Sequence, residues 1–388
     1  MKIAYVHDVI YPYVKGGAEK RVWEMARRLV DRGHEVHIFG MKYWDGDDVI
    51  EREGVHLHGV CEPLDLYVDG RRSIEAAVRF SWKLLWSLRG DFDVVDAQQF
   101  PYLPCFSAKL FCTLKRTALV ITWHEVWGDY WREYLGWKRI FGVGIEKITV
   151  RLPDKIIPVS ERVREDLIVM GVRNERMVVV PNGVDLRKMD GVREEEKVYD
   201  LVYAGRLSEH KRVDILLNAV SIAREEIPDI NCCIIGDGPE MEGLKRLVKE
   251  IGIEESVDFM GFLEREEDLI AGMKSSKIFV LPSAREGFGM SALEANACGL
   301  PVVTVRSDMN AASDLVEDGL NGFVCAPTPD EMAETIMKLL KAERYESLSE
   351  SSKRVAEKYD WSLVTDAIER AYKEVASRGA ACLVVPSG

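Results

Sequence analysis

Short apolar runs alternate with amphipathic stretches along the chain. The runs are rich in β-branched and aromatic residues, which is typical of buried strands, and the stretches between them have helical spacing. The expected strands cover residues 3–6, 35–39, 93–98, 118–122, 155–159, 200–204, 231–235, 277–281 and 301–305. Repetition of this unit predicts an α/β protein with parallel, doubly wound sheets.

The length of 388 residues suits two domains, each large enough to bury its own core. Segment 191–197 is charged and turn-like, so we expect the linker there. The predicted parts are a first domain at 1–190, a second at 191–358, a final helix at 359–378 and a tail at 379–388.

Composition narrows the class of protein. Hydrophobic residues make up 47% and charged residues 30%, as in folded globular proteins. The net charge of −13 disfavours a nucleic-acid binder, and the acidic excess is concentrated in residues 201–350, with 15 basic and 28 acidic side chains. The eight cysteines form no Cys-x-x-Cys pair, and no apolar stretch spans a bilayer. We therefore expect a reduced, cytoplasmic protein.

Two carboxylates flank a glycine-rich turn between two expected strands. Glu286 lies in the turn, and Glu294 lies on the helix that follows, so both can face the crevice above the strand ends. The first N–H groups of that helix, around Phe288, Gly289 and Met290, can bind an anionic oxygen. Carboxylates repel an anion but accept hydrogen bonds from hydroxyl groups. The pattern therefore predicts a ligand with both phosphates and hydroxyls, such as a sugar nucleotide.

This Glu-x7-Glu spacing encloses Gly-Phe-Gly and precedes Ala-Cys-Gly-Leu-Pro-Val-Val, and the whole stretch resembles the retaining GT-B glycosyltransferases of the family 4 (group 1) type. The resemblance implies two Rossmann-like, doubly wound parallel-sheet domains facing a central cleft, with a last helix that crosses back to the first domain. It also implies hexosyl transfer with retention and without a metal or other cofactor, and domain closure over the substrates. Glu286 would lie at the donor sugar and Glu294 at the ribose hydroxyls.

Further motifs extend the resemblance to the diphosphate of the donor. Gly16 and Gly17 end the loop before the first helix, and the resemblance places them at that diphosphate. Arg206 and Lys211, in a Gly-Arg-Leu segment and just after it, correspond to the residues that grip the leaving diphosphate. A forked guanidinium and a point charge both suit that role.

The expected strand at 118–122 leads into Thr-Trp-His-Glu, where the family usually carries Thr-x-His-Asp. The resemblance therefore makes His124 the active-site histidine, between donor sugar and acceptor. Asp96 and Gln98 stand where the family often carries His-x-His, and the resemblance assigns them no role.

The segment that frames the base in the family matches Phe262 and Leu263, and Glu264 follows it. A carboxylate can accept from guanine N1–H and N2–H₂, groups that uracil lacks, so Glu264 favours GDP-mannose slightly over UDP-sugars. Met241 stands where a dinucleotide fingerprint needs its third glycine, which disfavours NAD.

Segments 71–89 and 123–151 combine basic residues with tryptophans. This pattern suits an anionic membrane surface, or a lipid-linked acceptor bound at the inner face of the cell membrane. The competing interpretation is a pair of core helices with charged outer faces.

Other patterns leave alternatives. His37, and the pair His56 and His58, fall on strands without the spacing of a helical metal motif, so we expect no metal site.

A sugar-nucleotide epimerase or sugar phosphorylase can share the fold, and so can a non-catalytic nucleotide-binding subunit. Turnover without acceptor, or dependence on free phosphate, would identify the first two.

Overall fold

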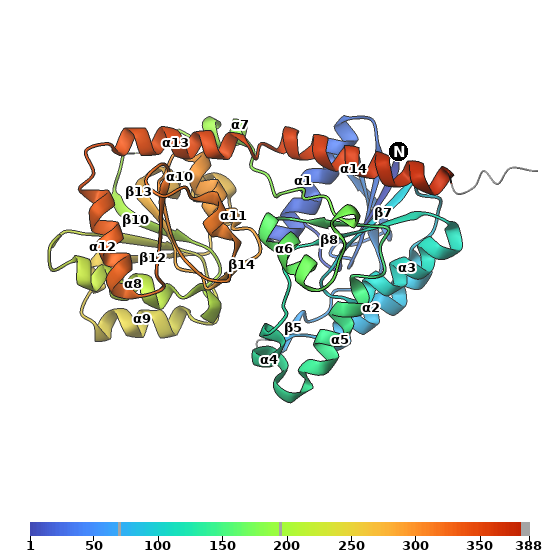
Figure 1. Ribbon diagram of the computed structural model, residues 1–388, viewed down its shortest axis with the longest axis horizontal. Helices are drawn as coiled ribbons and strands as arrows, with labels where there is room; N and C mark the ends of the chain where they lie inside the picture. The colour runs from blue at the N-terminus through green and yellow to red at the C-terminus, as the bar shows by residue number, and fades with distance from the viewer. Residues whose placement is uncertain (69–70, 194–195, 382–388) are drawn as a thin grey trace, which may run out of the picture. The chain divides into compact units, whose positions relative to one another are not determined.

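The structure is a computed structural model that describes residues 1–68, 71–193 and 196–381. The chain forms two compact units, one of residues 1–182 with the segment from Trp361 onward, the other of residues 183–360 (Figure 1). The break at Asn182 precedes the predicted linker, whose residues 194 and 195 lie outside the described residues. Most of the predicted tail, residues 382–388, also lies outside them.

The first unit contains a seven-stranded sheet in the order β3-β4-β2-β1-β7-β8-β9. All its strands are parallel except β3, which pairs antiparallel with β4. The strands are β1 Lys2–Val6, β2 Glu35–Gly40, β3 Val49–Arg52, β4 Val55–Gly59, β7 Val94–Gln98, β8 Ala118–Trp123 and β9 Lys155–Pro158. A separate two-stranded ribbon joins β5 Tyr67–Val68 to β6 Arg71–Arg72.

Helices pack against both faces of this sheet. The α-helices are α1 Gly17–Asp31, α2 Ile74–Ser87, α3 Leu103–Lys115, α4 Tyr130–Leu135, α5 Arg139–Thr149, α6 Glu161–Val169 and α14 Trp361–Ala381, and the 3-10 helices are η1 Gly136–Lys138 and η2 Asn174–Arg176. Helices α1 and α14 lie side by side on one face, and α3 contacts β7 and β8 with α2 beside it. The doubly wound arrangement expected from the sequence is present.

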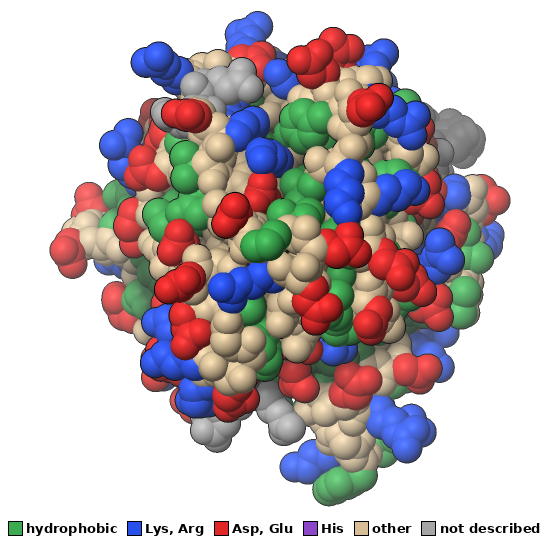
Figure 2. Space-filling view, turned by 90° about the vertical axis from the view of Figure 1, so that its left-hand side faces the viewer, with side chains coloured by type: hydrophobic (Ala, Val, Ile, Leu, Met, Phe, Trp, Pro, Cys, Tyr) green, Lys and Arg blue, Asp and Glu red, His purple; other side chains and the backbone are tan. Residues whose placement is uncertain are grey.

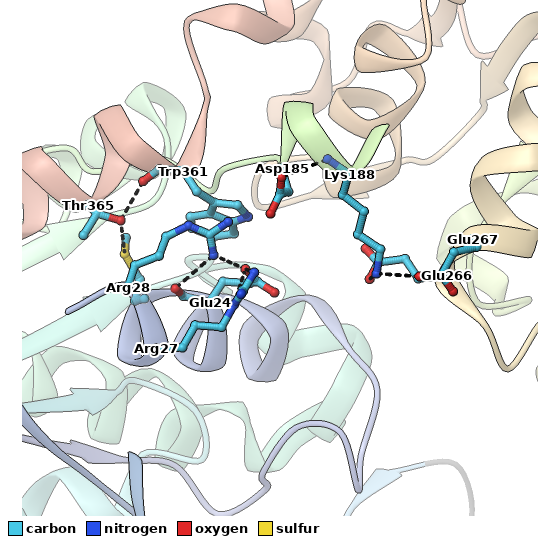
Figure 3. Close-up of polar contacts among 10 residues, drawn as sticks. Glu24, Arg27, Arg28, Asp185, Lys188, Glu266, Glu267, Trp361 and Thr365 are labelled. Atoms are coloured by element: carbon cyan, nitrogen blue, oxygen red, sulfur yellow. Dashed lines mark hydrogen bonds and ion pairs between the residues drawn. The ribbon is translucent and has the colours of Figure 1, made fainter. Parts of the chain in front are cut away.

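The C-terminal helix α14 belongs to the core of the first unit. Trp361 and Tyr372 are fully buried in the same apolar cluster as residues of β1 and α1. At the start of the helix, the Arg28 guanidinium lies 5.6 Å from the centre of the Trp361 ring, and Glu24 binds Arg28 (Figure 3). The Thr365 hydroxyl donates to the Trp361 carbonyl over 2.6 Å. The last helix is therefore an integral part of the first unit.

The second unit has a six-stranded sheet in the order β12-β11-β10-β13-β15-β17, parallel throughout. The strands are β10 Tyr199–Ala204, β11 Cys232–Ile235, β12 Val257–Gly261, β13 Ser276–Leu281, β15 Val302–Val305 and β17 Gly322–Cys325. Two short strands, β14 Arg285–Glu286 and β16 Met309–Asn310, pair in parallel beyond this sheet.

The α-helices of this unit are α7 Leu186–Gly191, α8 Val213–Ala223, α9 Met241–Glu250, α10 Glu266–Lys274, α11 Met290–Ala297, α12 Pro329–Leu340 and α13 Tyr345–Glu357, and the 3-10 helices are η3 Glu209–Lys211, η4 Glu254–Ser256 and η5 Ala311–Leu315. Helix α8 packs on α9 and α12, whereas α11 packs on α13. The Lys188 ammonium on α7 lies 2.8 Å from Glu266 and 3.1 Å from Glu267 on α10 (Figure 3). This pairing fixes α7 to the second unit.

The surface charge and the cysteines can be compared with what the sequence predicts. Figure 2 shows acidic side chains spread among basic ones on the visible face, without a broad basic area of the kind that binds nucleic-acid phosphates. Within the described residues, no helix has the length and apolar character needed to cross a membrane. Cys232, Cys233 and Cys298 are buried free thiols, as expected for reduced core residues.

Candidate active site

The predicted diphosphate residues follow β10, at the carboxyl edge of the second sheet. Gly236, after β11, comes so close to this loop that a Cβ atom there would lie 1.9 Å from the carbonyl oxygen of Gly205. The two turns can therefore approach each other only with glycine at this position. Arg206 directly follows Gly205 in the loop after β10, and Lys211 is the last residue of the 3-10 helix η3.

The structure brings Lys211 together with Glu286, the first carboxylate of the central motif. The Lys211 ammonium lies 2.6 Å from the Glu286 carboxylate, and both side chains are largely buried. The backbone N–H of Ala284 donates to the carbonyl of His210 over 2.9 Å, which joins the two loops. Residues far apart in sequence thus form one charged site at the ends of β10 and β13.

Sequence reasoning missed two members of this site, His210 and Arg285. Burial lowers the pKa of His210 to about 4, with further lowering by Lys211 and Arg285 and an opposing effect of Glu286. The imidazole is therefore neutral at pH 7. Arg285 was detectable, because it directly precedes Glu286 in the motif and adds a third cation to Arg206 and Lys211.

Buried polar side chains hold the loop that carries Glu286. Asn310, which pairs with Glu286 in the β14–β16 ladder, donates to the Thr304 hydroxyl over 3.1 Å and to the Val305 carbonyl over 2.8 Å. The Ser307 hydroxyl donates to the carbonyl of Ala284 over 2.7 Å. The two Asn310 bonds are buried and the Ser307 bond is partly buried, and together they hold the backbone that carries Glu286.

Helix α11 begins where the sequence predicts an anion site. Gly289 caps the helix at a φ of 95°, and a Cβ there would lie 2.5 Å from the Cβ of Ala312. The ring of Phe288 is buried, with its centre 5.7 Å from that of Tyr359. Met290 is the first helical residue, and Glu294 is buried one turn further on.

The predicted base-framing residues follow β12 at the same edge of the sheet. Gly261 accepts from the N–H of Gly236 over 2.8 Å, which links this loop to the turn after β11. Phe262 and Glu264 are exposed and Leu263 is half-buried. Phe262 and Glu264 are therefore accessible at this edge of the sheet.

The other predicted residues belong to the first unit. Gly16 is the extended N-cap of α1, and Gly17 is its first residue. A Cβ on Gly16 would lie 2.4 Å from the Glu19 carboxylate. Gly16 and Gly17 are themselves exposed, but the Glu19 carboxylate occupies the space beside Gly16.

His124 directly follows β8 and is held at two points. Its backbone N–H donates to Gln99 Oε1 over 2.9 Å, and its Nε2 lies 2.8 Å from Gln98 Oε1. Burial lowers the pKa of His124 well below its usual value, and the charges of Arg21 and His7 lower it further. A neutral imidazole in a fixed orientation therefore lies at the carboxyl edge of the first sheet.

Two sequence profiles cover this chain almost end to end. Residues 15–188 match the profile described as Glycosyltransferase Family 4, and residues 186–358 match Glycosyl transferases group 1. The chain belongs to the GT-B glycosyltransferases of the family 4 type. The resemblance drawn from the central motif is confirmed, and the chain is an enzyme of this class.

Individual relatives agree with this family. The glycosyltransferase is 25% identical to an uncharacterized glycosyltransferase of Methanocaldococcus jannaschii, over 95% of this chain and 97% of that one. It is 25% identical to the N-acetyl-alpha-D-glucosaminyl L-malate synthase of Bacillus anthracis, over 86% of each chain. The solved structure of Anabaena Alr3699/HepE in complex with UDP and glucose is similar in fold, with a TM-score of 0.73 and 20% identity over 96% of this chain and 99% of that one. The predicted GT-B fold is confirmed.

A histidine cluster lies on strands β2 and β4 of the first sheet of this glycosyltransferase. The ligand atoms of Glu35, His37 and His56 lie within 4.8 Å of one another, a grouping that the sequence spacing did not suggest. His37 lies 2.9 Å from Glu35 and 2.8 Å from His58, and the Lys2 ammonium lies 2.7 Å from Glu35. The carboxylate is therefore already held by a cation, and the cluster is separate from His124.

Proposed function

We propose that this glycosyltransferase transfers a hexosyl group from a nucleoside-diphosphate sugar, bound by the second unit, to a hydroxyl acceptor bound by the first. The observation that carries this proposal is the Lys211–Glu286 pair at 2.6 Å, with Arg206 and Arg285 beside it. In the reaction the bond between the sugar C1 and the diphosphate oxygen breaks, and its electron pair stays on the diphosphate. Fixed positive charges stabilise that leaving group.

The proposal includes retention at C1 and no requirement for a metal. Arg206 and Lys211 supply the positive charge that a divalent cation supplies in other transferases. Glu286 holds the Lys211 ammonium in place and lies where the donor sugar is expected. Glu294, one turn into α11, is the candidate partner of the ribose hydroxyls.

The first choice of donor is a UDP-sugar. Two facts support it: a similar fold is solved with UDP, and the B. anthracis relative is named for an N-acetylglucosaminyl product. GDP-mannose is the second candidate, because the exposed Glu264 carboxylate can accept from guanine. If guanine is the base, Glu264→Gln should weaken GDP binding and leave UDP binding unchanged. Titration calorimetry with both nucleotides will measure this.

His124 is the candidate catalytic residue of the first unit. We expect His124→Ala to abolish most of the transfer and to leave nucleotide affinity nearly intact, because the predicted nucleotide residues other than Gly16 and Gly17 lie in the second unit. Single-turnover transfer and calorimetric titration of the nucleotide test this in parallel. Unchanged transfer in the variant would refute the assignment.

The acceptor side includes an exposed aromatic and basic surface. Trp82 and Trp86 on α2 are 62% and 61% exposed, and Trp137 in η1 is 79% exposed. Phe80, Trp127 and Trp131 are instead buried, so the structure divides the aromatic residues of the two segments between core and surface. Exposed basic and apolar residues of the same segments include Arg79, Lys83, Lys138, Arg139, Ile140, Phe141 and Lys147, and the acidic residues Glu75, Asp129 and Glu133 are exposed there too.

We propose that this surface contacts an anionic membrane that carries a lipid-linked acceptor. Exposed tryptophans enter the interface between headgroups and acyl chains, and the basic side chains are attracted to anionic lipid. Flotation with anionic and with uncharged vesicles at low salt tests it. Binding that requires anionic lipid and is lost in Trp82→Ser/Trp86→Ser is the expected result, and no flotation would refute it.

A further inference from the structure

A buried polar network in the first unit starts at Asp96, on β7. The Thr122 hydroxyl lies 2.9 Å from both oxygens of this carboxylate and donates to it. The Tyr372 hydroxyl of α14 donates to Oδ2, and its oxygen lies 3.1 Å from the Tyr5 hydroxyl. Gln98 Nε2, two residues along β7, donates to Oδ1 over 3.3 Å. Strands β1, β7 and β8 and helix α14 thus converge on one carboxylate.

Gln98 connects this carboxylate to the active-site histidine. A carboxylate accepts hydrogen bonds and does not donate them, so the Gln98 amide must turn its NH₂ group toward Asp96. The Gln98 Oε1 then faces His124 Nε2, at 2.8 Å. An amide oxygen can only accept, so His124 must carry its proton on Nε2. Its Nδ1 is left as a hydrogen-bond acceptor.

We propose that Asp96 and Gln98 are positioning residues that fix the tautomer of His124, so that its Nδ1 accepts a hydrogen bond from a substrate hydroxyl. This inference rests on the proposed function, in which His124 lies between donor sugar and acceptor. It also gives a role to the two residues that stand where the family often carries His-x-His.

The surroundings of Asp96 show that the network is costly to bury. Burial raises the pKa of Asp96 to about 6, although hydrogen bonds from Tyr372 and Thr122 and the charge of Arg21 oppose the shift. Arg21, on α1, is itself buried and binds Asn182 and the Val180 carbonyl. The network also lines a cavity with room for about one water molecule. An apolar core at this place would avoid this cost, which favours a purpose beyond packing.

Nitrogen NMR of the full-length chain tests the proposal without any substrate. The two neutral tautomers of histidine give different long-range ¹H–¹⁵N patterns, and the His124 signals are identified by their loss in His124→Gln. The expected result at pH 7.5 is the Nε2–H tautomer. In Gln98→Met and in Asp96→Asn, whose amide can both donate and accept, we expect a mixture of the two neutral tautomers. Asp93→Asn, at the exposed residue just before β7, is the matched control and should leave the pattern unchanged.

Each outcome of the spectra decides the question. An Nδ1–H tautomer in the unmodified chain, or an undiminished Nε2–H population in Gln98→Met, overturns the proposal. If Asp96→Asn fails to fold, the unmodified chain and Gln98→Met still decide it. In transfer assays Gln98→Met should lower kcat about ten- to a hundredfold, as for other residues that orient a functional imidazole, and should leave the donor KM unchanged. Absence of transfer in the unmodified chain would count against the proposed function alone, because the tautomer is measured without turnover.

Discussion

Single charged residues at the strand ends carry most of the chemistry proposed for this enzyme. Lys211 and Glu286 were both predictable from motif spacing, because each stands at a fixed place in a sequence pattern. The role proposed for Gln98 was not predictable, since it depends on contacts with both Asp96 and His124, and His124 is 26 residues away in the chain. Local spacing therefore identifies the residues that we propose to touch substrate, whereas the residues proposed to orient them appear only in three dimensions.

Removing one cation from the diphosphate site tests the residue-level chemistry. Lys211→Ala should lose roughly 2 to 4 kcal/mol of transition-state stabilisation, because a charged donor at the leaving group is gone and Glu286 is left without this partner. The ratio of kcat/KM values gives this energy. Lys245→Ala is the control, because Lys245 is exposed on α9 and pairs only loosely with Glu242, at 3.5 Å. A Lys211 variant with full activity would contradict the assignment.

The histidine cluster on β2 and β4 predicts a pH dependence of stability. Burial, together with His37, lowers the pKa of His58 from 6.5 to about 4. The unfolded chain therefore binds more protons than the folded one between these values, and stability falls as pH drops from 6.5 toward 4. His58→Gln should reduce the loss of denaturant stability between pH 7.5 and pH 5. An equal loss in both proteins would show that His58 does not cause it.

At the scale of elements, the main strands and helices follow from the hydrophobic pattern, and the small elements do not. The short pair β14–β16 lies in segments that read as loops, yet it sets the position of Glu286. Its pairing depends on buried bonds from Asn310, which no local periodicity encodes. The start of α11 was visible in the sequence because Gly289 interrupts the apolar pattern.

The N-cap of α11 gives a prediction at this scale. Gly289→Ala should destabilise the protein by about 1 to 2 kcal/mol or more, because an L-residue is disfavoured at positive φ and the new Cβ would clash with Ala312. Gly144→Ala is the matched control, since Gly144 lies within α5 with open space around it. That change should be stabilising by roughly 0.5 to 1 kcal/mol. Equal denaturation midpoints for the two variants would contradict this account of the cap.

For the whole molecule, two parallel sheets with separate cores were predictable from length and periodicity. The position of the boundary between the units was harder to predict. It falls at Asn182 in the structure, because α7 pairs with the second unit through Lys188 and the acidic residues of α10. The C-terminal helix returns to the first unit because Trp361 and Tyr372 complete its apolar core. The division into two units and the return of the last helix to the first unit are both expected of the GT-B family.

Binding of nucleotides is the most direct test of the central claim, that this glycosyltransferase uses a nucleoside-diphosphate sugar. Thermal unfolding should be followed with UDP, GDP, ADP, their glucose, N-acetylglucosamine and mannose conjugates, and NAD as control. A ligand at 100 times its Kd adds about 2.7 kcal/mol, which raises Tm by several degrees at roughly 2 to 4 °C per kcal/mol. The account predicts such a shift with UDP and its sugars, or with the guanine set if Glu264 reads the base, and a smaller shift in Lys211→Ala. A shift with NAD alone, or with none of the nucleotides, would contradict it.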